Sequence, residues 1–491
     1  MPSSQGFVRT FARVLLTLFF RRVEVSGHEN LPASGGGMLL AWHPNGLIDP
    51  ALLLATFPGR IVFGARHGLF GWPLLGRLLR ACAVPIHRRQ DLRPGGEERA
   101  LNANRESLAA LADAVASGSY AVLFPEGDSH DESRPLALRT GAARLWLDAA
   151  ARGPDRLPHV IPVGLHYDRK RLFRSRALVA YLPPLDLAAA ATETGLDESG
   201  HPLATRQLTE RFAEALDRSV LATDDWREHH LIHRLRRIFR AERAVREGAN
   251  PGPSDMRERV RGFARVWTGY RRLREERREE IVRLRDRVDA YDRSLRQLGL
   301  EEHELDRDPP APHGRVLALL MLQRFVLDAL LPPLLLIGLV ANLPTALLLE
   351  GLVRAGARRK KDQATIKLLA GAVLFPATWL ALGALAAWGG TRLSALYPEV
   401  PDLPWLTGTL AALLSAVGGI LILVYGRLSR NWGRALLVRL KRRLLRHRID
   451  RLLAERAAIF AEAERLARDL DLPGAVAADG RVVDPGPPRP P

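Results

Sequence analysis

The residues best suited to chemistry lie in one short stretch, in which Asp49 follows His43 by six positions. The apolar run before them, residues 38–42, predicts a buried strand that ends at the histidine. Residues 44–46 (Pro-Asn-Gly) favour a turn, which can bring the carboxylate back onto the imidazole. A carboxylate that holds one ring nitrogen lets the other nitrogen remove a proton from a hydroxyl. The stretch therefore predicts a general base; a surface-loop histidine beside a capping aspartate is the simpler alternative.

Three further blocks follow predicted strands, at residues 84–88, 124–127 and 160–164. In this order and at this spacing, the four blocks resemble the glycerolipid acyltransferase family, which includes glycerol-3-phosphate and lysophosphatidate acyltransferases. The commonest family pattern has four residues between histidine and aspartate, whereas this chain has five. This departure brings the resemblance closest to the fungal-type glycerol-3-phosphate/dihydroxyacetone-phosphate acyltransferases. Four more segments also resemble that branch: residues 128–131, 173–176, 261–304 and 360–369.

The resemblance implies that His43 is the catalytic base and Asp49 its orienting partner. The acceptor hydroxyl would then attack the acyl thioester directly, with no acyl-enzyme. The resemblance also implies that Arg88 binds the phosphate of the acceptor, a group that a guanidinium matches with two hydrogen bonds. Neither a metal nor a cofactor is expected, and the acyl donor would be acyl-CoA or acyl-carrier protein.

The block Phe-Pro-Glu-Gly supplies two further site residues, Glu126 and Gly127, which the resemblance assigns to the acceptor site. Pro162 would help to line the acyl-donor site. For Glu126 and Pro162 a purely structural role is an equal alternative. The Thr-Arg pair of many relatives is replaced by Asp-Ser at residues 128–129, and Arg139 is expected to supply the missing positive charge.

An α/β domain over residues 25–224 is predicted to position these blocks, because short apolar runs alternate with helical patterns. The resemblance implies a mixed sheet flanked by helices. We expect strands at residues 37–42, 60–65, 82–87, 120–124, 159–167 and 176–182. We expect helices at residues 50–56, 71–80, 99–117, 138–151 and 205–221. Asp49 is expected at the N-cap of the first of these helices.

The composition limits the partners of the chain. Lys and Arg number 72 against 54 Asp and Glu, a net charge of +18, so an acidic partner is expected. The charge concentrates beside apolar segments near the C-terminus, without a nucleic-acid-binding motif, which favours an anionic membrane over nucleic acid. The single cysteine, Cys82, excludes an intramolecular disulfide and is expected in the core.

The membrane domain is predicted at residues 314–428. Two uncharged stretches, residues 368–388 and 405–425, are long enough to span a bilayer. Residues 316–349 contain three prolines and are expected to form a re-entrant hairpin or two short helices that return to the same side. Basic residues on either side of the two spans place the catalytic domain in the cytosol by the positive-inside rule.

Helices outside the bilayer are expected to flank this domain. Residues 1–24 predict an interfacial helix, with a helix packed on the protein's own core as the alternative. Residues 225–310 form a charged helical region, in which apolar spacing predicts two packed amphipathic helices. Residues 429–473 predict a basic amphipathic helix on anionic headgroups, or one that packs against a neighbour. The tail, residues 474–491, is expected to be disordered.

Together these features predict a membrane-bound acyltransferase of phosphatidate synthesis, with glycerol 3-phosphate or dihydroxyacetone phosphate as acceptor. A lysophosphatidate acyltransferase is the alternative within the class, and a non-catalytic membrane scaffold is the alternative outside it. The expected partners are membrane lipids, acyl-CoA and the acceptor, with no nucleic acid. The abundance of Ala, Leu and Arg suggests a bacterial inner membrane.

Overall fold

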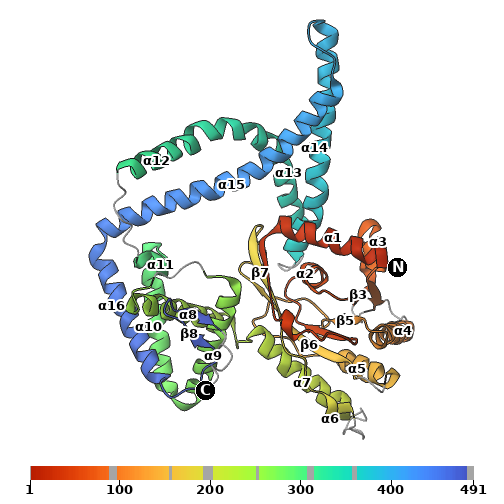
Figure 1. Cartoon of the computed structure of the whole chain (residues 1–491), viewed down its shortest axis with the longest axis vertical. Helices are drawn as coiled ribbons and strands as arrows, with labels where there is room; N and C mark the ends of the chain where they lie inside the picture. Colours follow the sequence, from red (N-terminus) through yellow and green to blue (C-terminus); the bar gives the residue numbers. More distant parts are fainter. Residues whose placement is uncertain are drawn as a thin grey trace.

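The computed structural model describes residues 2–87, 97–153, 157–191, 203–249, 254–306, 314–356 and 362–483. Figure 1 shows an α/β domain, a second domain of packed helices beside it, and a helical hairpin that projects away from both. The chain runs from the α/β domain into the helical domain, passes through the hairpin, and returns to the helical domain.

A seven-stranded sheet forms the centre of the α/β domain, in the order β1-β7-β6-β2-β5-β3-β4. Neighbouring strands are parallel, except that β6 and β7 are antiparallel, so the predicted mixed sheet is confirmed. Six strands lie where the sequence predicts them, and β1 is additional. The strands are β1 (Phe20–Ser26), β2 (Gly37–Ala41), β3 (Ile61–Arg66), β4 (Ala83–Ile86), β5 (Tyr120–Leu123), β6 (His159–Tyr167) and β7 (Ser175–Tyr181).

The central strand β2 sets the position of the candidate site. All five of its residues are buried, and it pairs in parallel with β5 on one side and β6 on the other. Parallel strands end at the same edge of a sheet, and ligands of open α/β sheets bind outside that carboxyl edge. The residues that follow β2, β5 and β6 therefore meet in space.

Helices pack against this sheet and complete its core, in which Leu111, Trp146 and Leu208 are buried with the strands. Cys82 lies in the same core, as predicted, and burial raises the pKa of its thiol to about 11. The helices are α1 (Pro2–Phe19), α2 (Ile48–Thr56), α3 (Pro73–Arg80), α4 (Glu97–Ala116), α5 (Gly141–Arg152), α6 (Ala188–Ala191) and α7 (Leu203–Val220), with 3-10 turns at His28–Asn30 and His67–Gly71.

The N-terminal helix α1 uses two faces. Leu16 and Phe19 are buried in the core of the α/β domain, whereas Phe7 and Leu18 are 66% and 54% exposed. The core-packed alternative therefore describes one face, and the other remains an apolar surface. The predicted helix over residues 1–24 ends earlier than expected, because the chain enters β1 at Phe20.

The helical domain has its own hydrophobic core, built by α8 (Trp226–Arg246), α9 (Met256–Glu276), α10 (Arg278–Leu298) and α16 (Arg446–Leu466), with the short α11 (Glu302–Leu305). The two predicted amphipathic helices correspond to α9 and α10. Apolar residues of both face this core, including Phe263 and Trp267 of α9 and Ile281 and Val288 of α10. The spacing of apolar residues therefore identified the buried faces correctly.

Residues 429–473 do not form one continuous helix, because a break at Leu445 begins the separate helix α16. The alternative of a helix that packs against a neighbour is confirmed for α16, whose apolar face lies in the core of the helical domain. The prediction that the whole tail is disordered is wrong. The tail is ordered up to residue 483, where β8 (Ala475–Val476) and β9 (Val482–Val483) form a small hairpin. Residues 484–491 lie outside the described residues.

The predicted membrane spans correspond to α14 (Asp362–Leu396) and the first part of α15 (Pro404–Leu444). Together with α13 (Leu331–Gly356), they are long and apolar enough to cross a bilayer. One polar group joins the three helices: the Asn342 amide donates to the Ser415 carbonyl (2.8 Å) and accepts from the Trp379 indole (2.9 Å). Such hydrogen bonds stabilise helix packing in lipid.

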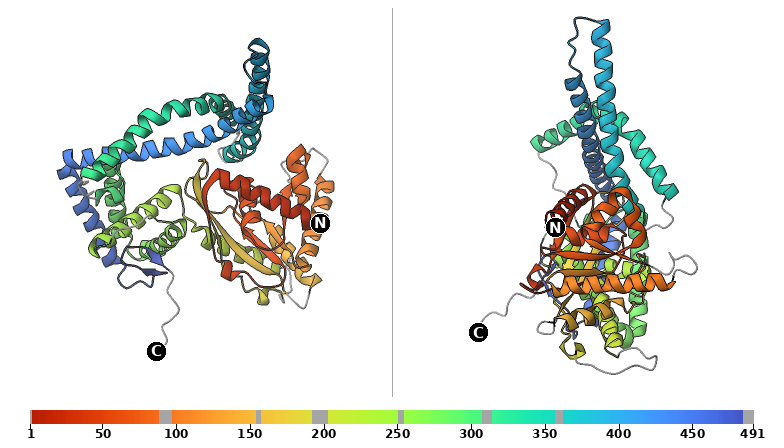
Figure 2. Two further views of the ribbon diagram at one scale, coloured as in Figure 1. Left: turned by 45° about the horizontal axis from the view of Figure 1, so that its top comes forward. Right: turned by 90° about the vertical axis from the view of Figure 1, so that its right-hand side faces the viewer.

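The segment for which a re-entrant hairpin is expected forms a wide arch, and its re-entry into a membrane stays a prediction. Residues 314–356 are helical throughout, as α12 (Gly314–Phe325), a π-helical turn (Val326–Leu330) and α13. Figures 1 and 2 show that α12 rises and α13 descends to the α/β domain, well short of the tip of the α14–α15 hairpin. The α/β and helical domains therefore lie on the same side of that hairpin.

A buried cation holds α16 in the helical domain. Arg456 is 1% exposed, and its guanidinium binds Asp306 through two hydrogen bonds of 2.6 and 2.8 Å. Its Nε donates to Glu242 at 3.1 Å. A charge at this depth is tolerated because carboxylates surround it.

We expect Arg456→Met to lower the free energy of unfolding of the helical domain by about 3–5 kcal/mol, because the buried Glu242 and the partly buried Asp306 lose their cation. Limited proteolysis in increasing urea would measure the change. Arg451→Gln is the control, since Arg451 is exposed on the same helix and should leave the transition unchanged. Equal transitions for both variants would contradict the role of Arg456.

Candidate active site

The structure brings His43 and Asp49 together at the carboxyl edge of the sheet. The Nδ1 atom of His43 lies 2.8 Å from Oδ2 of Asp49. Residues 43–47, here named the His43 turn, reverse the chain, and the Ile48 amide donates to the Asn45 carbonyl at 3.1 Å. Asp49 is not the N-cap as predicted. It lies in the first turn of α2, where the helix dipole favours a negative charge.

The carboxylate of Asp49 is fully buried and accepts three hydrogen bonds. Besides His43, the donors are the Asn45 amide (2.7 Å) and the hydroxyl of Tyr167. Burial and the nearby Asp49 hold the pKa of Tyr167 well above its ordinary value, so its hydroxyl remains a donor. An acceptor carboxylate requires the proton of the neutral His43 ring on Nδ1, which leaves Nε2 as the basic nitrogen.

Glu126 anchors the backbone of His43. Its Oε2 accepts from the His43 amide (3.0 Å), and its Oε1 lies 2.9 Å from Nε2 of His130. The His130 amide donates to the His43 carbonyl at 3.0 Å. Glu126 is buried, and its hydrogen bonds position His43. Its predicted contact with the substrate stays a prediction.

Phe124 packs on the imidazole. The two rings are stacked, with centroids 4.1 Å apart and an angle of 16°. Phe124 follows β5, the parallel neighbour of β2, so the sheet register brings it beside His43. The stack restricts the ring of the base to one plane.

Gly127 and Arg139 are in direct contact. The backbone of Gly127 has φ 77°, and a Cβ there would lie 2.7 Å from Nε of Arg139. The Arg139 amide donates to the Pro125 carbonyl (2.8 Å), which anchors the arginine at this block. The structure thus places the guanidinium of Arg139 over Gly127, where the sequence suggested a replacement for the missing arginine.

One predicted site residue lies outside the described residues, and another lies within the sheet. Arg88 lies outside the described residues; the described chain stops at His87, whose backbone forms two hydrogen bonds with Asn104 (2.7 and 2.8 Å). Pro162 is buried within β6 and opposite Leu40 of β2. The structure therefore places Pro162 inside the sheet, three positions before His43 in the β2 register.

The loop after β6 holds the His43 turn from the other side. Lys170 donates to the Pro44 carbonyl (3.1 Å) and pairs with Asp131 (2.6 Å). The Asn45 side chain donates to the Lys170 carbonyl at 3.1 Å. Burial alone would raise the pKa of Asp131, but Lys170 and Arg171 lower it overall, so this ion pair stays charged. The sequence analysis did not identify Lys170 or Tyr167; the position of Tyr167 at the end of β6 and of Lys170 just after it is the signal that could have done so.

The base of α14 rests on the His43 turn. The Leu47 amide donates to Oγ1 of Thr365 at 3.2 Å. Gly46 has φ 49°, and a Cβ there would lie 2.8 Å from the same oxygen. Ala364 and Leu368 are buried in the hydrophobic core of the α/β domain. The candidate membrane helix is thus a direct structural support of the turn that carries His43.

Comparison with known proteins identifies the domain. Residues 22–166 match the family model described as Acyltransferase. These residues are an acyltransferase domain. Two relatives are the glycerol-3-phosphate O-acyltransferases 1 and 2 of Saccharomyces cerevisiae, 24% and 27% identical over 260 and 202 residues. The matches cover 52% and 41% of this chain, but only 32% and 26% of those proteins. The chain therefore spans about a third or less of the length of these relatives.

Among solved structures, the 1-acyl-sn-glycerophosphate acyltransferase of Thermotoga maritima matches 43% of this chain and 79% of its own. The identity is 19% and the TM-score is 0.31.

The acyltransferase domain thus presents one histidine suited to remove a proton. Its Nδ1 is held by a buried carboxylate, its backbone by Glu126 and His130, and its ring by Phe124. Precise orientation of a base toward a hydroxyl is the geometric requirement of general-base catalysis.

We expect Gly46→Ala to lower acyl transfer at least tenfold, because the methyl group enters the space of Thr365 at a backbone φ of 49°. Thr365→Ala should lower it less, and should add no further loss to Gly46→Ala, since the alanine has already broken the contact. Initial rates of the two single variants and the double variant would measure this coupling. Thr365→Ser retains the hydroxyl and is the control. Fully additive losses would show that the contact does not matter.

Proposed function

We propose that this chain transfers a fatty acyl group from a thioester of CoA or acyl-carrier protein to the hydroxyl of glycerol 3-phosphate. The observation that carries the proposal is the bond between His43 and the buried carboxylate of Asp49 at the carboxyl edge of the sheet. The yeast relatives, which bear the name glycerol-3-phosphate O-acyltransferase, support this choice of acceptor.

In the proposed reaction, Nε2 of His43 removes the proton of the acceptor hydroxyl as its oxygen attacks the thioester carbonyl. The tetrahedral intermediate collapses, the carbon–sulfur bond breaks, and the imidazolium returns the proton to the leaving thiolate. An ester and a free thiol are formed. Asp49 stabilises the transient imidazolium, and Glu126 keeps the histidine backbone in place, so the base needs no rearrangement during the step.

The acceptor phosphate requires a fixed cation. We propose Arg88 as the residue that binds this phosphate, on the basis of the family resemblance of residues 84–88. Arg139 is a second cation at the Glu126–Gly127 block, held against Gly127. A pair of guanidiniums would suit a phosphate monoester, which carries close to two negative charges at neutral pH.

We propose that α14 and the first part of α15 cross a bilayer, with the acyltransferase domain on its cytosolic face. Both helices are apolar and mostly unburied within the structure, as expected for surfaces that face lipid. The tip of the hairpin, residues 389–404, contains one basic residue, Arg392 near the end of α14, whereas the sequence beside the other ends of the two spans is strongly basic. The positive-inside rule then places the domain where cytosolic acyl donors are available.

The first test is acyl transfer by the detergent-solubilised protein, with glycerol 3-phosphate and lysophosphatidate offered side by side and acyl-CoA or acyl-carrier protein as donor. We expect product from glycerol 3-phosphate that falls by about 10²–10⁴-fold in His43→Ala, the usual worth of a general base. His28→Ala is the control, since His28 is exposed and away from the site.

Product from lysophosphatidate alone would move the enzyme to the second acylation while keeping the mechanism. Absence of any His43-dependent product with either acceptor and either donor would contradict the proposed function and favour the non-catalytic scaffold.

Asp49→Asn should lower kcat by about 10³–10⁴-fold with little change in KM, because an amide can donate to Nδ1 and stabilise the wrong tautomer. Rates would be measured over a range of glycerol 3-phosphate concentrations. Asp113→Asn removes the same charge from an exposed position on α4 and should retain activity. Loss of substrate affinity without loss of kcat would contradict the orienting role.

A further inference from the structure

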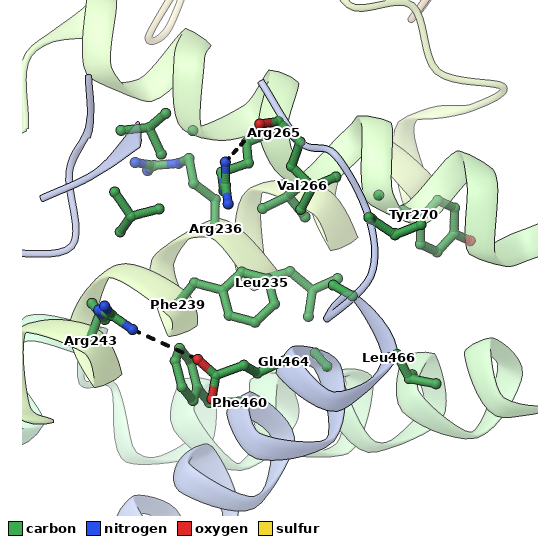
Figure 3. A pocket seen from close by; sticks show the side chains of 18 of the residues that line it. Leu235, Arg236, Phe239, Arg243, Arg265, Val266, Tyr270, Phe460, Glu464 and Leu466 are labelled. Carbon is green, nitrogen blue, oxygen red and sulfur yellow. Dashed lines mark hydrogen bonds and ion pairs between the residues drawn. The ribbon is translucent and has the colours of Figure 1, made fainter. Parts of the chain in front are cut away.

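A cavity of about 790 Å³ lies in the helical domain, between α8, α9, the end of α16 and the segment that follows it (Figure 3). None of its lining residues belongs to the His43 turn or to the blocks around it. Pockets for small organic ligands have volumes of about 300–1,000 Å³, so this cavity is large enough for one.

One part of the cavity wall is apolar. Leu235 and Phe239 of α8, Val266 of α9 and Phe460 of α16 line it, and the rings of Phe239 and Phe460 meet edge to face at 5.7 Å. Figure 3 shows these side chains between the helices. Such a wall favours a hydrocarbon chain, because each buried CH₂ contributes about 0.8 kcal/mol.

The rest of the wall is strongly basic. Six arginines and two glutamates line the cavity, which leaves positive charge in excess. The carboxylate of Glu258 lies near two of these arginines, 3.3 Å from Arg236 and 4.0 Å from Arg240.

Arg236 is the most informative of these cations. Only 7% of its surface is exposed, and its Nε has no hydrogen-bond partner among the described residues. Burial, with neighbouring arginines, lowers the pKa of Arg236 to about 10 even though Glu258 opposes the shift. A buried cation with an unused donor is stabilised by an added anion.

The rim of the cavity adds a partly exposed cation, Arg243. Arg243 is 37% exposed, and it lies 3.4 Å from Glu247 and 3.7 Å from Glu464. Glu464 is also within 3.6 Å of Arg246, which does not line the cavity. Because these pairs are loose and half-exposed, Arg243 can turn to an incoming anion at small cost.

We propose that this cavity binds a single-chain anionic amphiphile, with the hydrocarbon chain against Phe239 and Phe460 and the anionic head group on the arginines. The chemistry fits an acyl donor or a lysophospholipid carrying phosphate, and the site is separate from the one that holds His43. The proposal does not rest on the transfer reaction, because it concerns residues outside the acyltransferase domain.

The test uses full-length His43→Ala protein in lipid nanodiscs, so that no turnover occurs, and titrates decyl phosphate by calorimetry. Decanol and inorganic phosphate carry only the chain or only the charge, and both should bind at least tenfold more weakly. Decanoyl-CoA and 1-decanoyl-glycerol 3-phosphate then distinguish a donor from a lysophospholipid as the natural source.

Variants place the binding in the cavity. Arg243→Gln should raise the Kd for decyl phosphate about tenfold, as expected for loss of one charge-assisted hydrogen bond. Arg227→Gln is the matched control, since it removes the same charge from an exposed position of the same helix that does not line the cavity, and should leave the Kd unchanged. Glu464→Gln should tighten binding by releasing Arg243, and Val266→Trp should abolish it by filling the cavity.

Equal effects of Arg243→Gln and Arg227→Gln would overturn the proposal, because binding would then reflect surface charge alone. Binding of decanol or inorganic phosphate as tight as that of decyl phosphate would also overturn it. Arg243 is partly exposed, so its variant decides the question even where Val266→Trp does not fold.

Discussion

The buried carboxylate of Asp49 is the group on which the site depends. An ionised carboxylate without contact with water is stable only where donors surround it. Two of its donors, the ring of His43 and the backbone of Asn45, lie in the His43 turn, and the third is the hydroxyl of Tyr167 at the end of β6. The hydrogen bonds that stabilise this buried carboxylate therefore both close the His43 turn and orient the ring of the proposed base. Glu126 and Phe124 then hold His43 in that orientation.

The helices proposed to cross the membrane are part of this support. Ala364 and Leu368 belong to the core of the α/β domain, and Thr365 accepts a hydrogen bond from the His43 turn. Asn342 links α13 to the other two helices, so the bundle meets the turn as one unit. The helices proposed to anchor the protein in the membrane thus also help to position the turn that carries His43.

The helical domain places several of its charges in its interior. Arg234 and Arg456 are buried and pair with the buried carboxylates of Glu302 and Glu242, and Arg456 also pairs with the partly buried Asp306. These pairs join segments that are far apart in sequence. Breaking such a pair leaves an uncompensated charge, so the packing is specific. Where the carboxylates are too few, as around Arg236, the same arrangement leaves a basic cavity.

The sequence by itself determined most elements of the fold and the contact between His43 and Asp49. Short apolar runs located six strands, helical spacing located the seam of α10, uncharged stretches located the two long spans, and turn residues between His43 and Asp49 predicted their contact. Tertiary structure alone decided the rest, because its partners are distant: Tyr167 reaches Asp49 across 118 positions, and Thr365 reaches Leu47 across 318. The packing of α16, the hairpin at residues 475–483 and the arch of α12 and α13 were decided in the same way. Periodicity states which face of a helix is apolar, but not which neighbour covers it.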